Sequence, residues 1–414
     1  MVKKIVAIIL IFAVTSVAWM VLGVSTGSRT YGQNEKLSEQ VEGLWGSAHT
    51  QDAPDFYYET KQRRNVEKST TDEQGRQVKK AELVTETIAN KVNVESGDVQ
   101  VGFDLTHRKK GLLWYATYRV VYRATYGVRN PFPRPEQFKI DFTFPAKDAI
   151  YDDFRFLVNG KPVDVNDFSQ GKITVPLSLR DKETAQIEVG YVSQGMDKWL
   201  YKFSEGVARV KNFSLAMTTN FADIDFPRDT ISPTAKERTK DGWKLLWKYT
   251  DLVSGFQIGM DMPNKINPGP LASQISFFAP VSLLFFFFVV FMISEIRGIR
   301  IHPMNYVFLA AAFFAFHLLF AYTVDHIDLV PAFVISSVVS LFLVISYMRI
   351  VVGARFAAVE VGFSQFVFLI LFSLAHFFQG YTGLTVTIGA VITLWAMMQL
   401  TAKINWEEKF RKTG

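Results

Sequence analysis

Cysteine is absent from the 414-residue sequence. Its absence excludes a disulfide framework, a zinc site built on thiolates and a cysteine nucleophile. The HExxH zinc motif, the phosphate-binding P-loop and the GxGxxG dinucleotide-binding motif are also missing. The six histidines are scattered along the chain and have no metal-binding spacing. We therefore expect no enzymatic activity, no metal and no cofactor.

A strong excess of one charge is missing from the largest polar region. The formal net charge is +6, but the region from Ser25 to Gln274 holds 35 basic and 33 acidic residues. Most of the excess lies in short segments beside apolar stretches, which is a signal of membrane topology. The sequence therefore indicates no nucleic-acid partner.

Long apolar runs are the dominant feature of what is present. A membrane-spanning helix needs about 20 mostly apolar residues. Six stretches approach or reach that length: Ile5–Val24, Ile275–Ser294, Met304–Thr323, Leu329–Tyr347, Val359–Phe378 and Leu384–Leu400. The second contains four consecutive phenylalanines, Phe285 to Phe288, and a soluble protein does not expose so much apolar surface.

Basic residues beside these stretches all fall on one side of the predicted membrane. They are Lys3, Lys4, Arg297, Arg300, Arg349, Arg355, Lys403, Lys409, Arg411 and Lys412. The loops on the other side carry Asp325 and Asp328 in one case and no charge over Gln379–Gly383 in the other. Positive residues mark the cytoplasmic side. We therefore predict a multi-pass protein of the bacterial inner (plasma) membrane, with both termini cytoplasmic and residues 25–274 extracytoplasmic.

The first span has a second interpretation. Lys3, Lys4 and the apolar run that follows them also fit a cleaved signal peptide. No small-x-small cleavage site follows, and the apolar run continues through Trp19 to Leu22. These two features favour an uncleaved anchor.

Four regions follow from these boundaries: an anchor over 1–24, an extracytoplasmic domain over 25–270, a five-helix membrane domain over 271–402 and a cytoplasmic tail over 403–414. In the second region, alternation of apolar and polar residues predicts strands. These are 99–105, 112–128, 138–144, 154–163, 172–179, 185–192, 213–219, 243–250 and 255–260. The expected fold class is an α+β membrane protein, with a helical bundle of about six spans and a large, mainly antiparallel, sandwich-like β domain.

The remaining segments of this domain have weaker patterns. Apolar residues at i, i+4, i+7 and i+8 predict a short amphipathic helix over Glu35–Trp45. Thr50–Lys80 is polar and mixed in charge and is predicted to be a loop or a mobile excursion, and Lys80–Val92 fits either a helix or a strand. Pro263–Pro270 is predicted to be a stiff linker. The basic run Arg108–Lys110 is interpreted as a solvated turn between two strands, with a lipid or glycan site as the alternative.

Several segments resemble one known family. Arg300–Tyr306 (RIHPMNY), Phe316–Ile327 (FHLLFAYTVDHI), Ala332–Gly353 and the terminal Lys403–Trp406 (KINW) resemble the CreD family of inner-membrane proteins, as does Trp45–Pro54 after the first span. The resemblance covers nearly the whole chain. It implies an inner-membrane protein associated with envelope integrity and the stress response.

Two positions depart from the pattern of that family. Relatives typically show Glu-Asp-Tyr between the last two spans, where this chain has Gln379-Gly380-Tyr381. The terminal Asp-Trp-Tyr is replaced by Asn405-Trp406-Glu407. Roles that these positions have in the family are therefore not carried over to this chain.

Six residues are candidates for a functional or partner-contact role. His302 and Pro303 are predicted to begin the third span as a structural cap, and the resemblance adds a partner contact there as an alternative, which includes Tyr306. Asp325 and His326 could bind a cation, although a polar turn between two spans is the favoured interpretation.

The sixth candidate, His317, lies inside the third span. Ionisable groups within a membrane usually face a bundle interior or water and can relay protons or contact a substrate. A neutral histidine can instead hydrogen-bond between helices. Because no carboxylate is buried in a span to pair with His317, packing is favoured.

These observations lead to two hypotheses from different classes. The first is a non-enzymatic envelope-integrity or stress-response factor whose outer domain binds a protein, lipid or wall component, with membrane lipids and a protein partner or a second copy of the chain as its contacts. The second is a subunit of a transporter or channel, in which His317 and Gln365 line a path.

Overall fold

The computed structural model describes residues 2–71, 77–111, 113–164, 168, 171–204, 206–378 and 380–402. The predicted tail over 403–414, Gln379 and the terminal motif at Lys403–Trp406 lie outside these residues. The chain divides into two compact units. The helical unit comprises Met1–Leu37, Gly111–Leu113 and Ile266–Gly414, and the β unit comprises Ser38–Lys110 and Trp114–Lys265.

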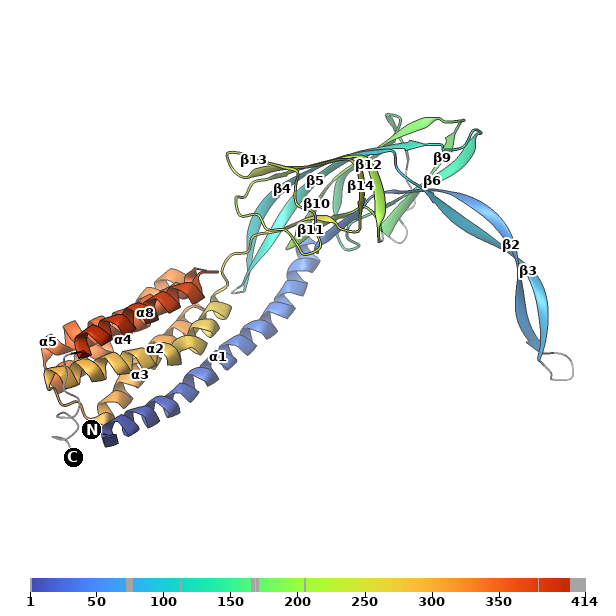
Figure 1. Ribbon diagram of the computed structural model, residues 1–414. Helices are drawn as coiled ribbons and strands as arrows, with labels where there is room; N and C mark the ends of the chain where they lie inside the picture. The colour runs from blue at the N-terminus through green and yellow to red at the C-terminus, as the bar shows by residue number, and fades with distance from the viewer. Residues whose placement is uncertain are drawn as a thin grey trace. The chain divides into compact units, whose positions relative to one another are not determined.

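Six helical segments of the described chain are long and apolar enough to cross a membrane (Figure 1). Five are α1 (Val2–Trp45), α2 (Pro268–Arg297), α3 (Pro303–Thr323), α4 (Leu329–Val352) and α8 (Thr382–Thr401). The sixth, Ala354–Phe377, alternates between helix types: α5 (Ala354–Phe356), η2 (Ala357–Val361), α6 (Gly362–Gln365), η3 (Phe366–Leu371), α7 (Phe372–Leu374) and η4 (Ala375–Phe377). Since η2 and η3 are π-helical, this span has a wider turn than its neighbours.

The first helix is longer than the sequence predicts. We expected a span over residues 5–24 and a separate short helix over Glu35–Trp45, but α1 is continuous from Val2 to Trp45. Residues 25–34 contain no proline, so every backbone N–H is available for the helix, and the two apolar segments join in one helix despite the Gly27-Ser28 pair. The predicted linker Pro263–Pro270 is correspondingly shorter, because α2 begins at Pro268, a position that favours proline.

Aromatic side chains hold the helical unit together. Trp19 of α1 packs edge-on against Phe314 with ring centroids 5.1 Å apart, and Phe316 packs against Phe333 at 5.5 Å. Ser340 of α4 donates a hydrogen bond to the carbonyl of Ala312 in α3 at 2.7 Å. Small and hydroxyl-bearing residues at such contacts allow helices in a membrane to approach closely.

The described residues of the β unit form three sheets (Figure 1). The eight-stranded sheet has the order β13-β14-β12-β4-β5-β10-β7-β8, the four-stranded sheet β3-β2-β6-β9, and the three-stranded sheet β1-β11-β15. The strands are β1 (His49–Asp52), β2 (Asp55–Thr71), β3 (Gln77–Val92), β4 (Ser96–Lys110), β5 (Leu113–Arg129), β6 (Glu136–Thr143), β7 (Tyr151–Val158), β8 (Lys161–Pro162), β9 (Lys172–Leu179), β10 (Thr184–Met196), β11 (Lys198–Lys202), β12 (Ala208–Thr219), β13 (Ala235–Arg238), β14 (Trp243–Ser254) and β15 (Ile258–Asp261).

Most strand pairs are antiparallel, as the sequence predicts, and β12 with β4 and β1 with β11 are parallel. Alternating side chains form the core: in β5, Tyr118, Val120, Tyr122, Ala124 and Tyr126 are buried, while Arg119 and Arg123 on the other face are exposed. A hairpin turn at Asn159 and Gly160 joins β7 to β8, with positive φ at both residues.

The prediction of a loop over Thr50–Lys80 is wrong, and Lys80–Val92 is a strand. The strands β2 and β3 pair in register from Phe56↔Val92 to Thr71↔Gln77 and leave the sheets as a two-stranded ribbon (Figure 1). Cross-strand ion pairs stabilise its base, among them Lys91–Asp55 at 2.8 Å. The larger apolar residues of β3, Leu83, Val84 and Ile88, are exposed and do not alternate with polar ones, so the alternation that identifies a half-buried strand is missing.

Candidate functional site

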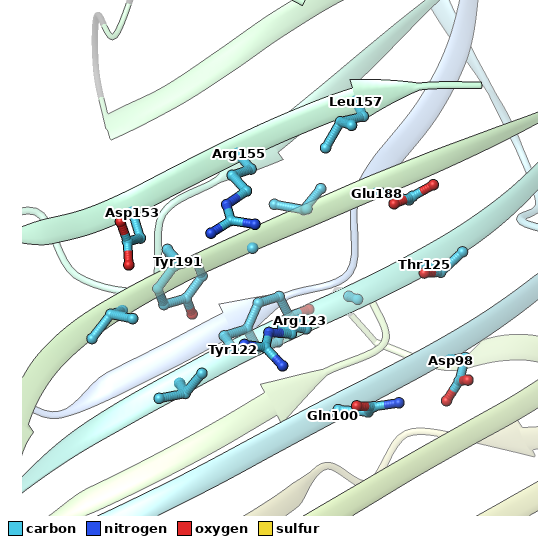
Figure 2. A pocket seen from close by; sticks show the side chains of 15 residues that line it. Asp98, Gln100, Tyr122, Arg123, Thr125, Asp153, Arg155, Leu157, Glu188 and Tyr191 are labelled. Carbon is cyan, nitrogen blue, oxygen red and sulfur yellow. The ribbon is translucent and has the colours of Figure 1, made fainter. Parts of the chain in front are cut away.

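A groove with a cavity volume of about 360 Å³ lies on the face of the eight-stranded sheet that carries the polar side chains (Figure 2). It crosses four neighbouring strands, β4, β5, β10 and β7. Its polar lining residues are Asp98, Gln100, Arg123, Thr125, Asp153, Arg155 and Glu188. The whole groove belongs to the β unit.

Strand register places a glycine between two arginines in this groove. Gly190 of β10 is paired with Arg123 of β5 on one side and with Arg155 of β7 on the other. A Cβ added at Gly190 would lie 3.5 Å from the Tyr122 carbonyl oxygen and 3.9 Å from Cγ of Arg123. The position is therefore open above the strand. The hollow exists because glycine has no side chain at the centre of this row.

A local irregularity bends β7 beside this row. Between Gly190 and Val192 the register with β7 shifts, so that Val192 pairs with Asp152 and Gly190 pairs with Arg155. Asp153 lies in the extra segment and has φ 51. Bulges of this kind twist a strand and change the direction of the following side chain. The neighbouring Arg155 is aimed over the groove (Figure 2).

The two arginines are exposed, and in the described part of the chain neither takes part in an ion pair. Their strands are separated by β10, so their backbones lie about 10 Å apart. Both side chains are long enough to reach one group above Gly190. Guanidinium groups bind carboxylates and phosphates through two parallel hydrogen bonds. The centre of the groove is therefore suited to an anionic group.

Acidic side chains lie toward the two ends of the groove. Asp153 lies at one end, and Glu188 and Asp98 lie at the other (Figure 2). All three line the cavity. A ligand with a negative centre and positive or hydrogen-bond-donating ends fits this arrangement of charge better than a simple inorganic anion.

A rigid aromatic layer supports the groove from below. Tyr122 and Tyr191 stack at 4.9 Å, and the Tyr122 hydroxyl lies 2.8 Å from that of Tyr126, which is 3.1 Å from that of Tyr201. The Tyr191 hydroxyl donates to Oε1 of Gln51 at 2.8 Å. Burial raises the pKa of all four phenols well above the usual value, so they stay neutral.

The candidates at the head of the third span have structural contacts. His302 is the N-cap of α3, and its Nδ1 accepts a hydrogen bond from the backbone N–H of Met304 at 3.2 Å. Pro303 occupies the first turn. Tyr306 is fully buried and packs edge-on against Phe287 at 5.1 Å. A partner contact at this end stays a prediction.

The other candidates lie elsewhere in the helical unit. Asp325 forms an ion pair with Arg29 at 2.9 Å, whereas His326 is exposed in the turn after α3. His317 is buried, its Nδ1 is 3.1 Å from the Phe313 carbonyl oxygen, and its ring lies 5.9 Å from that of Trp19. Since α3 separates His302 from Asp325 by about 30 Å, the six candidates do not form a single site.

The described residues contain no group of three or more histidine, aspartate or glutamate side chains that could hold a metal ion. The segment Gly23-Val24-Ser25-Thr26-Gly27 has the GxSxG spacing of a serine nucleophile. A nucleophile of that kind requires a sharp turn between a strand and a helix. Ser25 lies inside the continuous helix α1, so the geometry does not match.

Sequence reasoning did not identify Arg123, Arg155 or Gly190. For each arginine, the local sequence pattern predicts only a solvated residue on the polar face of a strand. The bulge at Asp153 has no clear sequence signal. A glycine within a strand is the one available hint, because it often marks a bulge or a close approach of another group.

The structure thus defines a class of protein: a multi-span membrane protein that carries a β domain with a charged groove. The family model described as "Inner membrane protein CreD" matches residues 1–407. The chain belongs to this family of inner-membrane proteins. No curated protein sequence matches the chain.

Solved structures show only weak similarity. A putative nutrient binding protein from Legionella pneumophila is 11% identical with a TM-score of 0.33, over 59% of this chain and 94% of that one. An M1 zinc metallopeptidase from Deinococcus radiodurans is 13% identical with a TM-score of 0.24, over 41% of this chain and 42% of that one. The chain thus spans less than half of the peptidase, and these TM-scores carry no functional inference.

Proposed function

We propose that the chain is a non-enzymatic envelope-integrity factor whose β domain lies outside the cytoplasm and binds an anionic group of an envelope component in the Arg123–Arg155 groove. The observation that carries this proposal is the row Arg123–Gly190–Arg155, in which two guanidinium groups that form no ion pair with the described residues lie beside an open position. Membership of the CreD family supports the location in the inner membrane.

The charge pattern of the groove points to a class of ligand. A peptide with a free carboxylate fits, because its carboxylate would lie between the arginines while its amino or amide groups reach Asp153 at one end or Glu188 at the other. Wall components and extracytoplasmic protein termini both supply such groups. Each charge-assisted contact contributes roughly 1.5–3 kcal/mol when formed, so removal of either arginine should weaken binding measurably.

Binding can be tested with the full chain in detergent. A library of short peptides with free C-terminal carboxylates is compared with the same peptides as C-terminal amides, by microscale thermophoresis. We expect carboxylate-dependent binding that Arg123→Ala and Arg155→Ala each weaken about tenfold or more. Arg119→Ala, on the same strand but outside the groove lining, is the matched control. Equal binding of acids and amides, or equal loss in the control, would contradict the proposal.

The proposed orientation has its own test. Because the chain has no cysteine, single cysteines can be introduced at Lys161 in β8 and at Arg300, both of which are exposed. We expect a membrane-impermeant maleimide to label Lys161→Cys in intact cells and to label Arg300→Cys only after permeabilisation. The reverse pattern would place the β domain in the cytoplasm.

A further inference from the structure

Basic and tryptophan side chains gather at the end of the β4–β5 hairpin and in the segment before α2. Lys265 lies 4.3 Å from the centre of the Trp114 ring, and Lys109 lies 5.8 Å from it. Arg108 lies 3.5 Å from the centre of the Trp45 ring. The Nε2 atom of His107 is 2.7 Å from the carbonyl oxygen of Pro263, which joins the hairpin to the segment that carries Lys265.

Chain connectivity limits the distance between Lys265 and the first residue of α2. Lys265 is three residues before Pro268, the first residue of α2, and three residues span at most about 11 Å. The hairpin tip Gly111–Leu113 itself belongs to the helical unit. Lys110 directly precedes this tip and Trp114 directly follows it. Lys265 therefore lies within about 11 Å of the first residue of α2, and Lys109 lies beside the same Trp114 ring as Lys265.

The positive charges of the cluster are available for an external ligand. Arg108, Lys109 and Lys265 are exposed, and no ion pair is present for any of them among the described residues. Tryptophan is enriched at the boundary between lipid and water, because its ring is apolar and its N–H is polar. Lysines next to a membrane attract anionic lipids.

We infer that Arg108, Lys109, Lys110, Trp114 and Lys265 form a binding site for the headgroup of an anionic phospholipid. The lysines and Arg108 contact the phosphate, and Trp114 holds Lys109 and Lys265 at the level of the headgroups. The solvated turn predicted for Arg108–Lys110 is thereby reinterpreted. This site is separate from the groove at Gly190, so an experiment can contradict either proposal without affecting the other.

The test is native mass spectrometry of the full chain in detergent, titrated with phosphatidylglycerol or with phosphatidylcholine. We expect the unmodified chain to retain phosphatidylglycerol in preference to phosphatidylcholine. Removal of two charges near an anionic lipid should weaken binding about 30-fold. The variant Lys109→Ala/Lys265→Ala should accordingly lose the preference, and Lys109→Arg/Lys265→Arg should keep it.

A matched control removes the same charge elsewhere. Lys161 and Lys240 are also exposed and belong to the β unit, so Lys161→Ala/Lys240→Ala should leave the lipid preference unchanged. Circular dichroism and thermal melting establish that each variant is folded. Equal binding of both lipids to the unmodified chain, an unchanged preference in Lys109→Ala/Lys265→Ala, or an equal loss in the control would overturn the inference.

Discussion

Arg29 of α1 forms an ion pair with Asp325 at the end of α3, with Nη2 and Oδ2 2.9 Å apart. The guanidinium also donates to the carbonyl of Ala321 at 3.4 Å and lies 5.3 Å from the centre of the Tyr322 ring. These contacts fasten the first helix to the rest of the helical unit. They give α1 a structural role beyond that of a simple anchor.

We expect Arg29→Ala and Asp325→Ala each to destabilise the helical unit by about 1 kcal/mol, because the pair is partly exposed. In the double variant the loss should be smaller than the sum of the two, since the interaction can be removed only once. Thermal melting of the purified chain in detergent measures the three values. Lys36→Ala, an exposed change on the same helix, should have almost no effect. Strict additivity in the double variant would show that the two side chains do not interact.

A side chain added at Gly190 should weaken peptide binding, and with alanine it should do so without lowering the stability of the protein. The open space above this position accommodates a methyl group, and alanine is less costly than glycine to order in a strand. Gly190→Ala should melt at the same temperature as the unmodified chain or slightly above it, and Gly190→Val should block the centre of the groove. Peptide binding by microscale thermophoresis should fall in the order glycine, alanine, valine. Unchanged peptide binding in Gly190→Val would show that the ligand does not bind at the centre of this groove.

His49 should make the β unit sensitive to acid. Its imidazole is fully buried, and this burial lowers the pKa to about 4, against the opposing effect of the Gln194 carbonyl. The unfolded chain takes up a proton near pH 6.5, whereas the folded chain does not. The free energy of unfolding should therefore fall by about 3 kcal/mol between pH 6.5 and pH 4, and His49→Phe should reduce that fall. Chemical denaturation at a series of pH values measures it, and the exposed His326→Gln should not change it.

Asp197 should act in the opposite direction. Burial of the carboxylate raises its pKa to about 6, and the negative charges of Glu42 and Asp261 add to this rise. The folded state therefore binds the proton more tightly than the unfolded state, and this residue adds stability as the pH falls from about 7 towards 4. Asparagine, like aspartate, tolerates the positive φ of 63° at this position, so Asp197→Asn removes the charge without straining the backbone. We expect it to raise the melting temperature at pH 8 and to leave it nearly unchanged at pH 4; equal shifts at both values would contradict this account.

A polar contact inside the helical unit gives a fifth prediction. Gln365 donates from Nε2 to Oγ of Ser340 at 2.8 Å, and Ser340 donates to the carbonyl of Ala312. Ser340→Ala should cost about 1 kcal/mol, because it leaves the amide of Gln365 without this partner. Adding Gln365→Leu should restore most of the loss. Unfolding in mixed detergent measures both variants, and a larger loss in the double variant would indicate a second role for Gln365.

Membrane spans and several strands follow from local patterns, which is why they could be predicted. A span requires a continuous apolar run, and a half-buried strand requires alternation, as in Lys172–Leu179, which forms β9 over the predicted residues. The ribbon of β2 and β3 has neither pattern, because its few larger apolar residues, such as Leu83, Val84 and Ile88, are exposed and do not alternate with polar ones. Likewise, nothing in residues 25–34 indicated that the first span and the Glu35–Trp45 helix would be one helix.

By itself, the sequence determined the number of apolar helices, the β-rich character of the region between the first two and the family resemblance near His302. Only the tertiary structure placed Arg123 and Arg155 on either side of Gly190. It also placed both Lys109 and Lys265 beside the ring of Trp114. The physical reason is that each pair joins residues far apart in the chain. Strand register and backbone hydrogen bonds decide which of them become neighbours, and no local pattern of apolar residues encodes that choice.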